Sequence, residues 1–305
     1  MASVVVNVPY GGLFMPPAVA KRLSLKQEEI GWENFRLADP CLLGMLARAC
    51  EAGTLEGGLG EKEVPERTLV SYSFSPLVAD PLGFLASEVG DGAAGGTDGV
   101  LKGGPKGPSV IPRGASGLPL FDWTDPEREL IFKKSALPYL AEVRDRVKEI
   151  LDRDSLVLLV TARSYAARPW DYERDRRYPR PQLGIGALDG KRTPKGLSAF
   201  IGRTFKAFGL WPELDWPHRG AWVPPELAQH PRLLCCTFSF RRDLYMDEAS
   251  GRIASCSEGL SRMLRTVFGL IEEELEESVK ARYRRRNPPK RPSMVIKATP
   301  NPKAP

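Results

Sequence analysis

Few side chains in this 305-residue sequence could hold a metal ion or activate a nucleophile. There are two histidines, His218 and His230, and each stands beside a proline in a loop-like context. A catalytic zinc site of the hydrolase kind needs imidazoles and a carboxylate that converge on an open coordination position. Because the two histidines lie in separate loop-like contexts, we expect surface or loop-packing roles for them rather than a shared metal.

The five cysteines, Cys41, Cys50, Cys235, Cys236 and Cys256, include no Cys-x-x-Cys pair. Neighbouring Cys235 and Cys236 would point to opposite faces of a strand, so they cannot bond to each other. This odd set predicts reduced thiols in a reducing compartment. No apolar run is long enough to span a membrane, and we expect no signal peptide because the sequence becomes strand-like almost at once. We therefore expect a cytoplasmic protein that is not secreted, with the cytoskeleton or a cilium or flagellum as more specific locations.

Four stretches combine strand-like runs with small or polar residues where the strand ends. They are Asn7-Val-Pro-Tyr-Gly-Gly12, Ser75-Pro-Leu-Val-Ala-Asp80, Thr161-Ala-Arg-Ser-Tyr165 and Phe238-Ser-Phe-Arg-Arg-Asp-Leu-Tyr-Met-Asp-Glu248. In order and spacing they resemble the signature blocks of the N-formylglutamate amidohydrolase family, over about residues 4–250. The resemblance implies a zinc hydrolase related in fold to the metallo-carboxypeptidases, with histidines on the metal and a carboxylate that activates water.

The resemblance places Tyr10 and Arg163 where the family has metal-binding histidines, and Ser239 where it has the general-base glutamate. A phenol with an ordinary pKa of about 10 is a poor zinc ligand, and a protonated arginine repels a divalent cation. A lone hydroxyl cannot activate water as a carboxylate does, and without a nearby histidine it is not a nucleophile. We expect no catalytic residue and no bound metal, with Arg163 contacting Asp80 or its neighbours instead. Taken without the resemblance, Tyr10 is a half-buried residue of a tight turn.

The second stretch resembles the family block that binds the carboxylates of the substrate. Ser75 and Asp80 match it, but Pro76, Leu82 and Gly83 replace its arginines and asparagine, and none of them can imitate a guanidinium fork. Weaker matches are Pro138-Tyr-Leu140, Gly184-Ile-Gly186 and Asp215-Trp-Pro-His-Arg-Gly220. The vestigial pocket would draw its residues from Ser75, Asp80, Ser164, His218 and Arg242, although we expect Arg242 and Tyr245 to be structural.

The elements that must position these residues alternate between strands and helices, which predicts an α/β fold. We expect a three-layer sandwich, phosphorylase/hydrolase-like, with a central, largely parallel mixed sheet flanked by helices over residues 1–275. A Gly/Pro-rich loop interrupts it at about 90–117. Strands are expected at 3–8, 68–74, 156–160 and 233–240, and helices at 17–31, 38–52, from Thr124 onward, at 198–208 and at 258–286.

Charge separates the end of the chain from the rest. The net charge is +6, and nine basic residues but no acidic ones lie from Lys280 onward, so the body is mildly acidic. Prolines after Asn287 exclude helix and central strand, which makes residues 276–305 the end of a C-terminal helix and an extended basic arm. The glutamates of 272–277 are expected on a solvated helix face.

These features favour a catalytically inactive amidohydrolase-like protein, a pseudoenzyme, that serves as a structural or interaction component of a cytoskeletal or ciliary assembly without a cofactor. The arm would bind an acidic partner protein, with tubulin or an axonemal assembly as candidates, and RNA is less favoured because the body has no basic bias. The arm residues expected to contact the partner are Arg282, Arg284, Arg285, Arg286, Lys290 and Arg291.

Two alternatives stay open. One is an active zinc hydrolase that cleaves the amide bond of an N-acyl amino acid, with ligands drawn from Asp39, Asp80 or Asp171 together with His218. The other is a small-molecule sensor that uses the vestigial pocket.

Overall fold

The computed structural model describes residues 1–54, 63–83, 124–170 and 175–286. At its centre is a six-stranded sheet in the order β4-β1-β5-β8-β6-β7. Strand β6 is antiparallel to β8, and the other neighbours pair in parallel. The strands are β1 (Ala2–Val8), β4 (Leu69–Ser71), β5 (Leu156–Tyr165), β6 (Leu183–Gly186), β7 (Pro212–Leu214) and β8 (Leu233–Arg241). Two short strands, β2 (Gly53–Thr54) and β3 (Glu63–Val64), pair separately.

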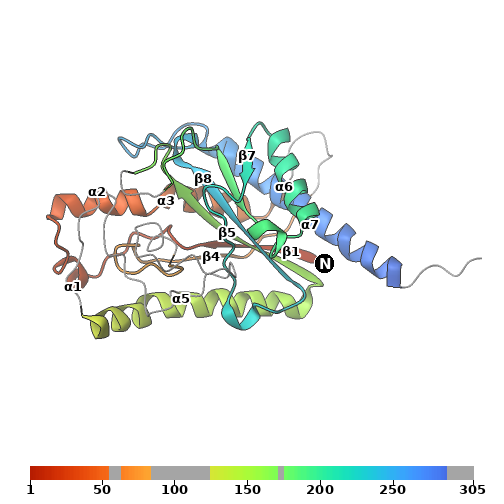
Figure 1. Ribbon diagram of the computed structural model, residues 1–305, viewed down its shortest axis with the longest axis horizontal. Coiled ribbons are helices and arrows are strands. Elements are labelled where there is room, and N and C mark those ends of the chain that lie inside the picture. Colours follow the sequence, from red (N-terminus) through yellow and green to blue (C-terminus); the bar gives the residue numbers. More distant parts are fainter. Residues whose placement is uncertain (55–62, 84–123, 171–174, 287–305) are drawn as a thin grey trace, which may run out of the picture.

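Helices cover both faces of this sheet (Figure 1). Helix α5 (Asp125–Arg153) packs on one face, and α3 (Pro40–Cys50), α6 (Lys195–Ala207) and α7 (Ser257–Arg286) pack on the other. The three-layer α/β sandwich with a largely parallel mixed sheet confirms the fold predicted from the sequence. Shorter elements are α1 (Pro17–Ala20), α2 (Gln27–Leu37) and three 3₁₀ turns at Leu188–Gly190, Pro225–Leu227 and Arg242–Leu244.

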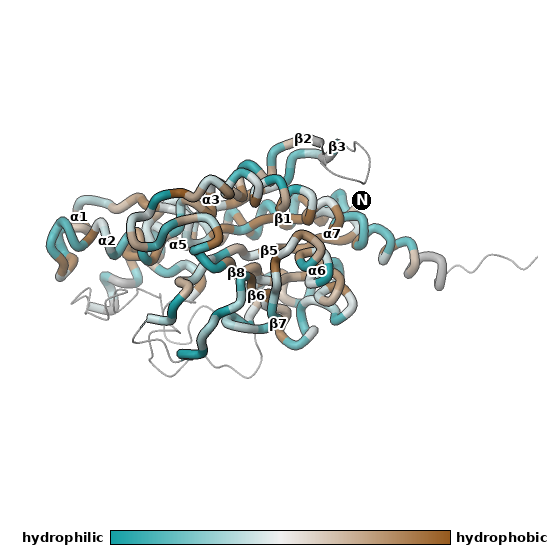
Figure 2. The backbone as a smooth tube through the Cα atoms, turned by 90° about the horizontal axis from the view of Figure 1, so that it is seen from above, coloured by the Kyte–Doolittle hydropathy of each residue, from teal (hydrophilic) through white to brown (hydrophobic). Residues whose placement is uncertain are grey.

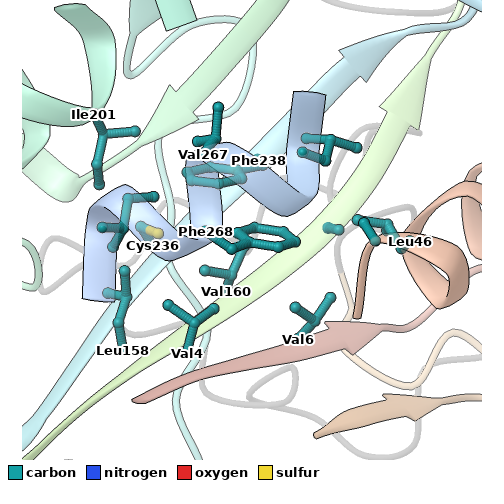
Figure 3. Close-up of a cluster of buried hydrophobic side chains, with 14 of the residues drawn as sticks. Val4, Val6, Leu46, Leu158, Val160, Ile201, Cys236, Phe238, Val267 and Phe268 are labelled. Atoms are coloured by element: carbon teal, nitrogen blue, oxygen red, sulfur yellow. The ribbon is translucent and has the colours of Figure 1, made fainter. Parts of the chain in front are cut away.

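The strands alternate their side chains between the two helical layers. Adjacent Cys235 and Cys236 of β8 belong to different core clusters, which confirms the prediction that they point to opposite faces. Figure 3 shows the cluster beneath α3, α6 and α7, where alternate apolar residues of β1, β5 and β8 meet Phe268 of α7. Continuous burial of these strands on both faces explains their uninterrupted apolar sequence.

Helix starts follow local capping chemistry. Helix α5 starts where the sequence predicts a helix, after Thr124. There the Thr124 hydroxyl and the Glu127 carboxylate form a capping box, and the helix continues through Pro138. The single helix predicted for 17–31 is wrong, because the chain forms α1 and then α2. The Glu29 carboxylate accepts a 2.7 Å hydrogen bond from the Lys26 backbone N–H and starts the second helix there.

The glutamates of α7 do not all lie on a solvated face. The Glu272 carboxylate accepts hydrogen bonds from Nε and Nη2 of Arg67, whose side chain is 1% exposed, at 2.8–3.1 Å. The prediction is therefore wrong for Glu272, because Arg67 in the segment that leads into β4 needs a buried counter-charge. By contrast, Glu277 pairs with Lys280 at the exposed surface.

Helix α7 runs without a break past residue 275, and its last part extends beyond the sheet (Figure 1). Figure 2 shows that this last part is mainly hydrophilic. The domain boundary predicted at residue 275 stays a prediction. None of the described helices has both the length and the apolar character needed to cross a membrane. The predicted partner-contacting residues Arg282, Arg284, Arg285 and Arg286 belong to the end of α7, whereas Lys290, Arg291 and the 90–117 loop lie outside the described residues.

Candidate functional site

Toward the carboxyl ends of the parallel strands, the sheet face beneath α5 changes from apolar to polar. Val5, Leu159 and Cys235 contribute to the core on this face, and the next residues of the same parity are polar. Strand register places Thr161 opposite Asn7 and Thr237, and Arg163 opposite Ser239. We call these five side chains, each at most 2% exposed, the polar patch: Asn7, Thr161, Arg163, Thr237 and Ser239.

Helix α5 contributes a phenol to the polar patch. The Tyr139 hydroxyl donates to Oδ1 of Asn7, and Nδ2 of Asn7 donates to Oγ1 of Thr161 at 3.4 Å. Burial raises the pKa of Tyr139 well above its ordinary value, so the phenol keeps the proton that it donates. This chain of hydrogen bonds joins helix α5 to the neighbouring strands β1 and β5.

Tyr10 and Asp80 form a buried pair at the end of β1. The Tyr10 hydroxyl donates to Oδ1 of Asp80 at 2.8 Å, and the same oxygen accepts the backbone N–H groups of Leu82 and Gly83 at 3.2 and 2.9 Å. Tyr10 is 5% exposed, so it is buried rather than half-buried as the turn context predicted. Three donors satisfy a carboxylate oxygen that has lost its contact with water.

Arg163 lies against this pair. Its guanidinium carbon is 5.6 Å from the centre of the Tyr10 ring, a cation–π distance. The predicted contact of Arg163 with a neighbour of Asp80 is therefore confirmed through Tyr10. Asp80 also raises the pKa of Tyr72 through its negative charge, although burial of Tyr72 is the larger cause.

Ser239 has a histidine beside it, contrary to the prediction from the sequence. Its Oγ lies 2.9 Å from Nδ1 of His218, and the His218 ring makes an edge contact with Tyr165 at 5.7 Å between ring centres. Ser239 is fully buried and His218 is partly buried. The prediction failed because the two residues are 21 positions apart on different elements.

Two glycines of β6 explain how His218 reaches the sheet. A Cβ atom at Gly184, the register partner of Ser239, would lie 2.5 Å from the Trp216 carbonyl oxygen. At Gly186 it would lie 2.8 Å from the His218 carbonyl oxygen. The loop that carries His218 therefore packs directly on the backbone of β6, which only glycine permits. This Gly-x-Gly pattern is the sequence signal that could have predicted the contact.

The remaining pocket candidates have local structural partners. The Ser75 hydroxyl donates to Oδ1 of Asn34 at 2.6 Å and accepts the Leu77 N–H at 3.0 Å. Ser164 accepts a 3.0 Å hydrogen bond from Nε of Arg242 on the sheet face opposite the polar patch. Arg242 also donates to the carbonyl oxygens of Phe35, Arg36 and Ala38, and so fastens the end of α2.

Asp39, a metal ligand under the active-hydrolase alternative, caps helix α3. Its Oδ1 accepts the Leu42 N–H at 2.8 Å, and its Oδ2 accepts the Tyr245 hydroxyl and lies 3.6 Å from Nε of Arg242. Asp171 lies outside the described residues. Within the parts of the chain that the structure describes, no three His, Cys, Asp or Glu side chains gather closely enough to hold a metal ion.

Comparison with known protein families shows to which family the chain belongs. The model of the N-formylglutamate amidohydrolase family matches residues 2–246. The chain belongs to this family. The N-formylglutamate amidohydrolase of Ralstonia eutropha JMP134 has a similar fold, with a TM-score of 0.65 and 18% identity over 90% of this chain and 94% of that one. A gene product of Agrobacterium tumefaciens is also similar, with a TM-score of 0.57 and 16% identity over 91% and 92% of the two chains. No curated protein matches.

Tyr10 and Arg163, which the sequence resemblance assigns to the metal site of the family, do not fit a zinc ion. The Tyr10 hydroxyl directs its proton to Asp80, and the Arg163 guanidinium lies on the same ring. The repulsion between an arginine and a divalent ion about 4 Å apart is on the order of 8 kcal/mol at an effective dielectric constant of about 20. This family member therefore combines the fold of the family with a buried polar patch at the carboxyl ends of the parallel strands.

Proposed function

We propose that this family member does not carry out zinc-dependent amide hydrolysis and serves as a structural or binding component of a larger assembly. The observation that supports this is the Tyr10–Asp80 hydrogen bond beneath the Arg163 guanidinium. The sequence resemblance assigns Tyr10 and Arg163 to the metal positions of the family, and a zinc ion there would have to displace the fixed positive charge of Arg163.

The position of the general base supports the same proposal. Ser239 lies where the family resemblance expects a glutamate, and its hydroxyl has no carboxylate to take a proton from water. A missing metal and a missing general base would each remove several kcal/mol of transition-state stabilisation. Without either group, zinc-dependent hydrolysis has no mechanism.

A direct assay tests the loss of zinc-dependent hydrolysis. Purified full-length protein, equilibrated with zinc, is incubated with N-formylglutamate and with N-acetyl amino acids, and the released amino acid is measured. We expect no release above the rate without protein. Release that a chelator abolishes and zinc restores would contradict the proposal.

We further propose that the basic arm beyond Lys280 is the anchor of the protein on an acidic partner. Helix α7 carries the start of this arm away from the sheet (Figure 1), where a partner can reach it. The partner is an acidic protein filament or assembly, and tubulin and the axoneme are candidates on charge alone. Capture of purified tubulin by the full chain, compared with a chain that ends at Lys280, tests this. Equal capture by the two would reject the arm as anchor.

One specific contact favours a second candidate function, an active hydrolase that uses no metal. The 2.9 Å distance between Ser239 Oγ and His218 Nδ1 is that of a nucleophile and its base. In such a reaction the Ser239 oxygen attacks the amide carbonyl, His218 takes the proton and returns it to the leaving amine, and water releases the acid.

Complete burial of Ser239 weighs against this second function, because a substrate carbonyl must reach the hydroxyl. A fluorophosphonate that labels activated serines distinguishes the two functions. We expect no label on Ser239 in the native protein. A label that disappears in Ser239→Ala but persists in a Ser257→Ala control would establish the second function instead.

A further inference from the structure

The first half of β1 is an open edge of the central sheet. Strand β4 pairs with β1 from Val6 onward, and within the described residues no other strand pairs with β1 on that side. The backbone N–H of Ala2 donates instead to Oε1 of Glu276 on α7 at 3.4 Å. That of Val4 donates to Oε1 of Glu272 at 3.2 Å. Side chains thus stand where a neighbouring strand would lie, and the carbonyl groups of the same edge remain as acceptors.

A groove of about 490 Å³ lies along this edge, between β1, the segment that leads into β4, the end of α5 and α7. We call it the edge groove. Its described lining holds two arginines and six acidic side chains, which are Glu63, Glu66, Asp154, Glu272, Glu273 and Glu276. The adjoining undescribed residues 55–62 contain two glutamates and one lysine, so they do not reverse the sign of this charge. The edge groove therefore favours a cationic occupant.

One buried donor in the edge groove lacks an acceptor. The side chain of Arg67 is 1% exposed, and its Nε and Nη2 donate to Glu272. Its Nη1 has no hydrogen-bond partner among the described residues. Because buried guanidinium N–H groups normally find an acceptor, an incoming carbonyl oxygen would complete this side chain. Together the free edge, the donor and the carboxylates match an extended basic peptide.

The sequence of the C-terminal arm contains a peptide of this kind. Between Pro292 and Pro300 the seven residues Ser-Met-Val-Ile-Lys-Ala-Thr include no proline. Three of them are β-branched, which favours a strand, and Lys297 supplies the cation. Prolines at both ends exclude a central strand but not a short edge strand.

The arm is long enough to return to the edge groove. At 1.5 Å per residue, Arg286 at the end of α7 lies about 15 Å beyond Glu276. Residues 287–292 span up to about 20 Å when extended, so the next residue can reach Glu276. We propose that residues 293–299 fold back and pair with the open edge of β1 as a short strand in line with β4, with Lys297 bound by the carboxylates of α7. The proposal requires neither the loss of hydrolysis nor the anchoring role of the arm.

Hydrogen exchange of the full-length chain, followed by mass spectrometry, tests the pairing. Residues 293–299 should exchange their backbone N–H groups about tenfold or more slowly than a synthetic peptide of residues 287–305. Glu273→Gln combined with Glu276→Gln should shift this rate toward that of the peptide, because the carboxylates that bind Lys297 are lost. Glu274→Gln is the matched control, since Glu274 is a similarly half-buried residue of α7 that does not line the edge groove. Equal exchange in the full chain and the peptide, or equal rates in the double variant and the control, would overturn the proposal.

Carbodiimide cross-linking identifies the occupant of the edge groove. The reagent joins an ammonium group to a carboxylate in contact with it, with loss of water. We expect Lys297 to be linked to Glu273 or Glu276 of the same chain, in a mixture of isotopically light and heavy full-length protein. Links between light and heavy chains alone would show that the arm of a second copy fills the groove. That result, or no link from Lys297 to these glutamates, would overturn the proposal.

Discussion

The two faces of the central sheet differ in chemistry although the same strands build both. Beneath α3, α6 and α7, alternate residues of β1 and β8 are apolar along the whole strand and those of β5 are apolar as far as Ala162, and they pack against Phe268 (Figure 3). Beneath α5, the apolar core gives way to the polar patch near the carboxyl ends of the strands. Carboxyl ends of parallel strands are where α/β proteins place ligands.

The apolar face maintains the fold, whereas the polar face carries the side chains that could take part in a reaction. A fold can persist at 16–18% identity to its solved relatives because apolar residues of similar volume replace one another at modest cost. The polar face is less tolerant, since each buried donor and charge there needs a partner. On this face a hydrogen bond joins Tyr10 to Asp80, and a cation–π contact joins Arg163 to the Tyr10 ring.

The largest expected effect is on the apolar face. Phe268→Ala removes a fully buried ring that stacks on Phe238 at 6.4 Å, and should lower the free energy of unfolding by about 3–5 kcal/mol. Urea denaturation measures it. Phe208→Ala, a matched change at a 42% exposed ring, should cost much less. Similar losses in the two variants would show that the Phe268 cluster is not the core that we describe.

The ion pair between Arg67 and Glu272, which lies beside Phe268, gives the next effect. Glu272→Ala leaves the guanidinium of Arg67 buried without its carboxylate, and should cost about 3 kcal/mol. Glu277→Ala breaks an exposed pair with Lys280 and should change stability by less than about 1 kcal/mol. Urea denaturation measures both variants. Equal losses of unfolding free energy would show that Glu272 lies on a solvated helix face, as the sequence predicted.

On the polar face, Tyr10→Phe removes a single hydroxyl. Because Asp80 then loses a buried donor, we expect the free energy of unfolding to fall by about 1–3 kcal/mol. Tyr178→Phe, at a 64% exposed ring, is the control and should be neutral. If Tyr10→Phe left the free energy of unfolding unchanged, the Tyr10–Asp80 hydrogen bond would contribute nothing to stability.

The smallest effect is at the exposed start of α5 and depends on pH. Hydrogen bonds from Arg22 and Thr124 lower the pKa of Glu127 to about 2, below the ordinary value of about 4.3. The resulting stabilisation is fully present above about pH 5 and is lost as pH falls toward 2. The melting temperature of Glu127→Gln should lie slightly below that of the native chain at pH 7, and the gap should close by pH 2. A difference in melting temperature that grows as the pH falls would contradict the predicted direction of the Glu127 effect.

Local patterns predicted the elements, and long-range contacts accounted for the errors. Apolar runs and capping residues predicted β5, β8 and the start of α5, because those signals lie within a few residues. Glu272 was misplaced because its partner Arg67 is 205 positions away. His218 was assigned to a surface loop because its contact with Ser239 depends on glycines of a third segment, β6.

The family motifs predicted which positions form the site but not how they bond. The sequence indicates that Tyr10, Asp80, Arg163 and Ser239 share one region, and the structure divides them into two contacts, one with Tyr10 at its centre and one with His218. Hydrogen-bond geometry of this kind depends on side-chain positions that no spacing rule supplies.

The central claim is our proposal that Tyr10, Arg163 and Ser239 exclude zinc through their own side chains. Metal analysis of the native chain and of a variant that combines Tyr10→His, Arg163→His and Ser239→Glu, both equilibrated with zinc and desalted, tests it most directly. We predict no stoichiometric zinc in the native chain and about one zinc ion per chain in the variant, because imidazole and carboxylate groups are regular zinc ligands. About one zinc ion in the native chain, lost on Asp80→Asn, would contradict the claim.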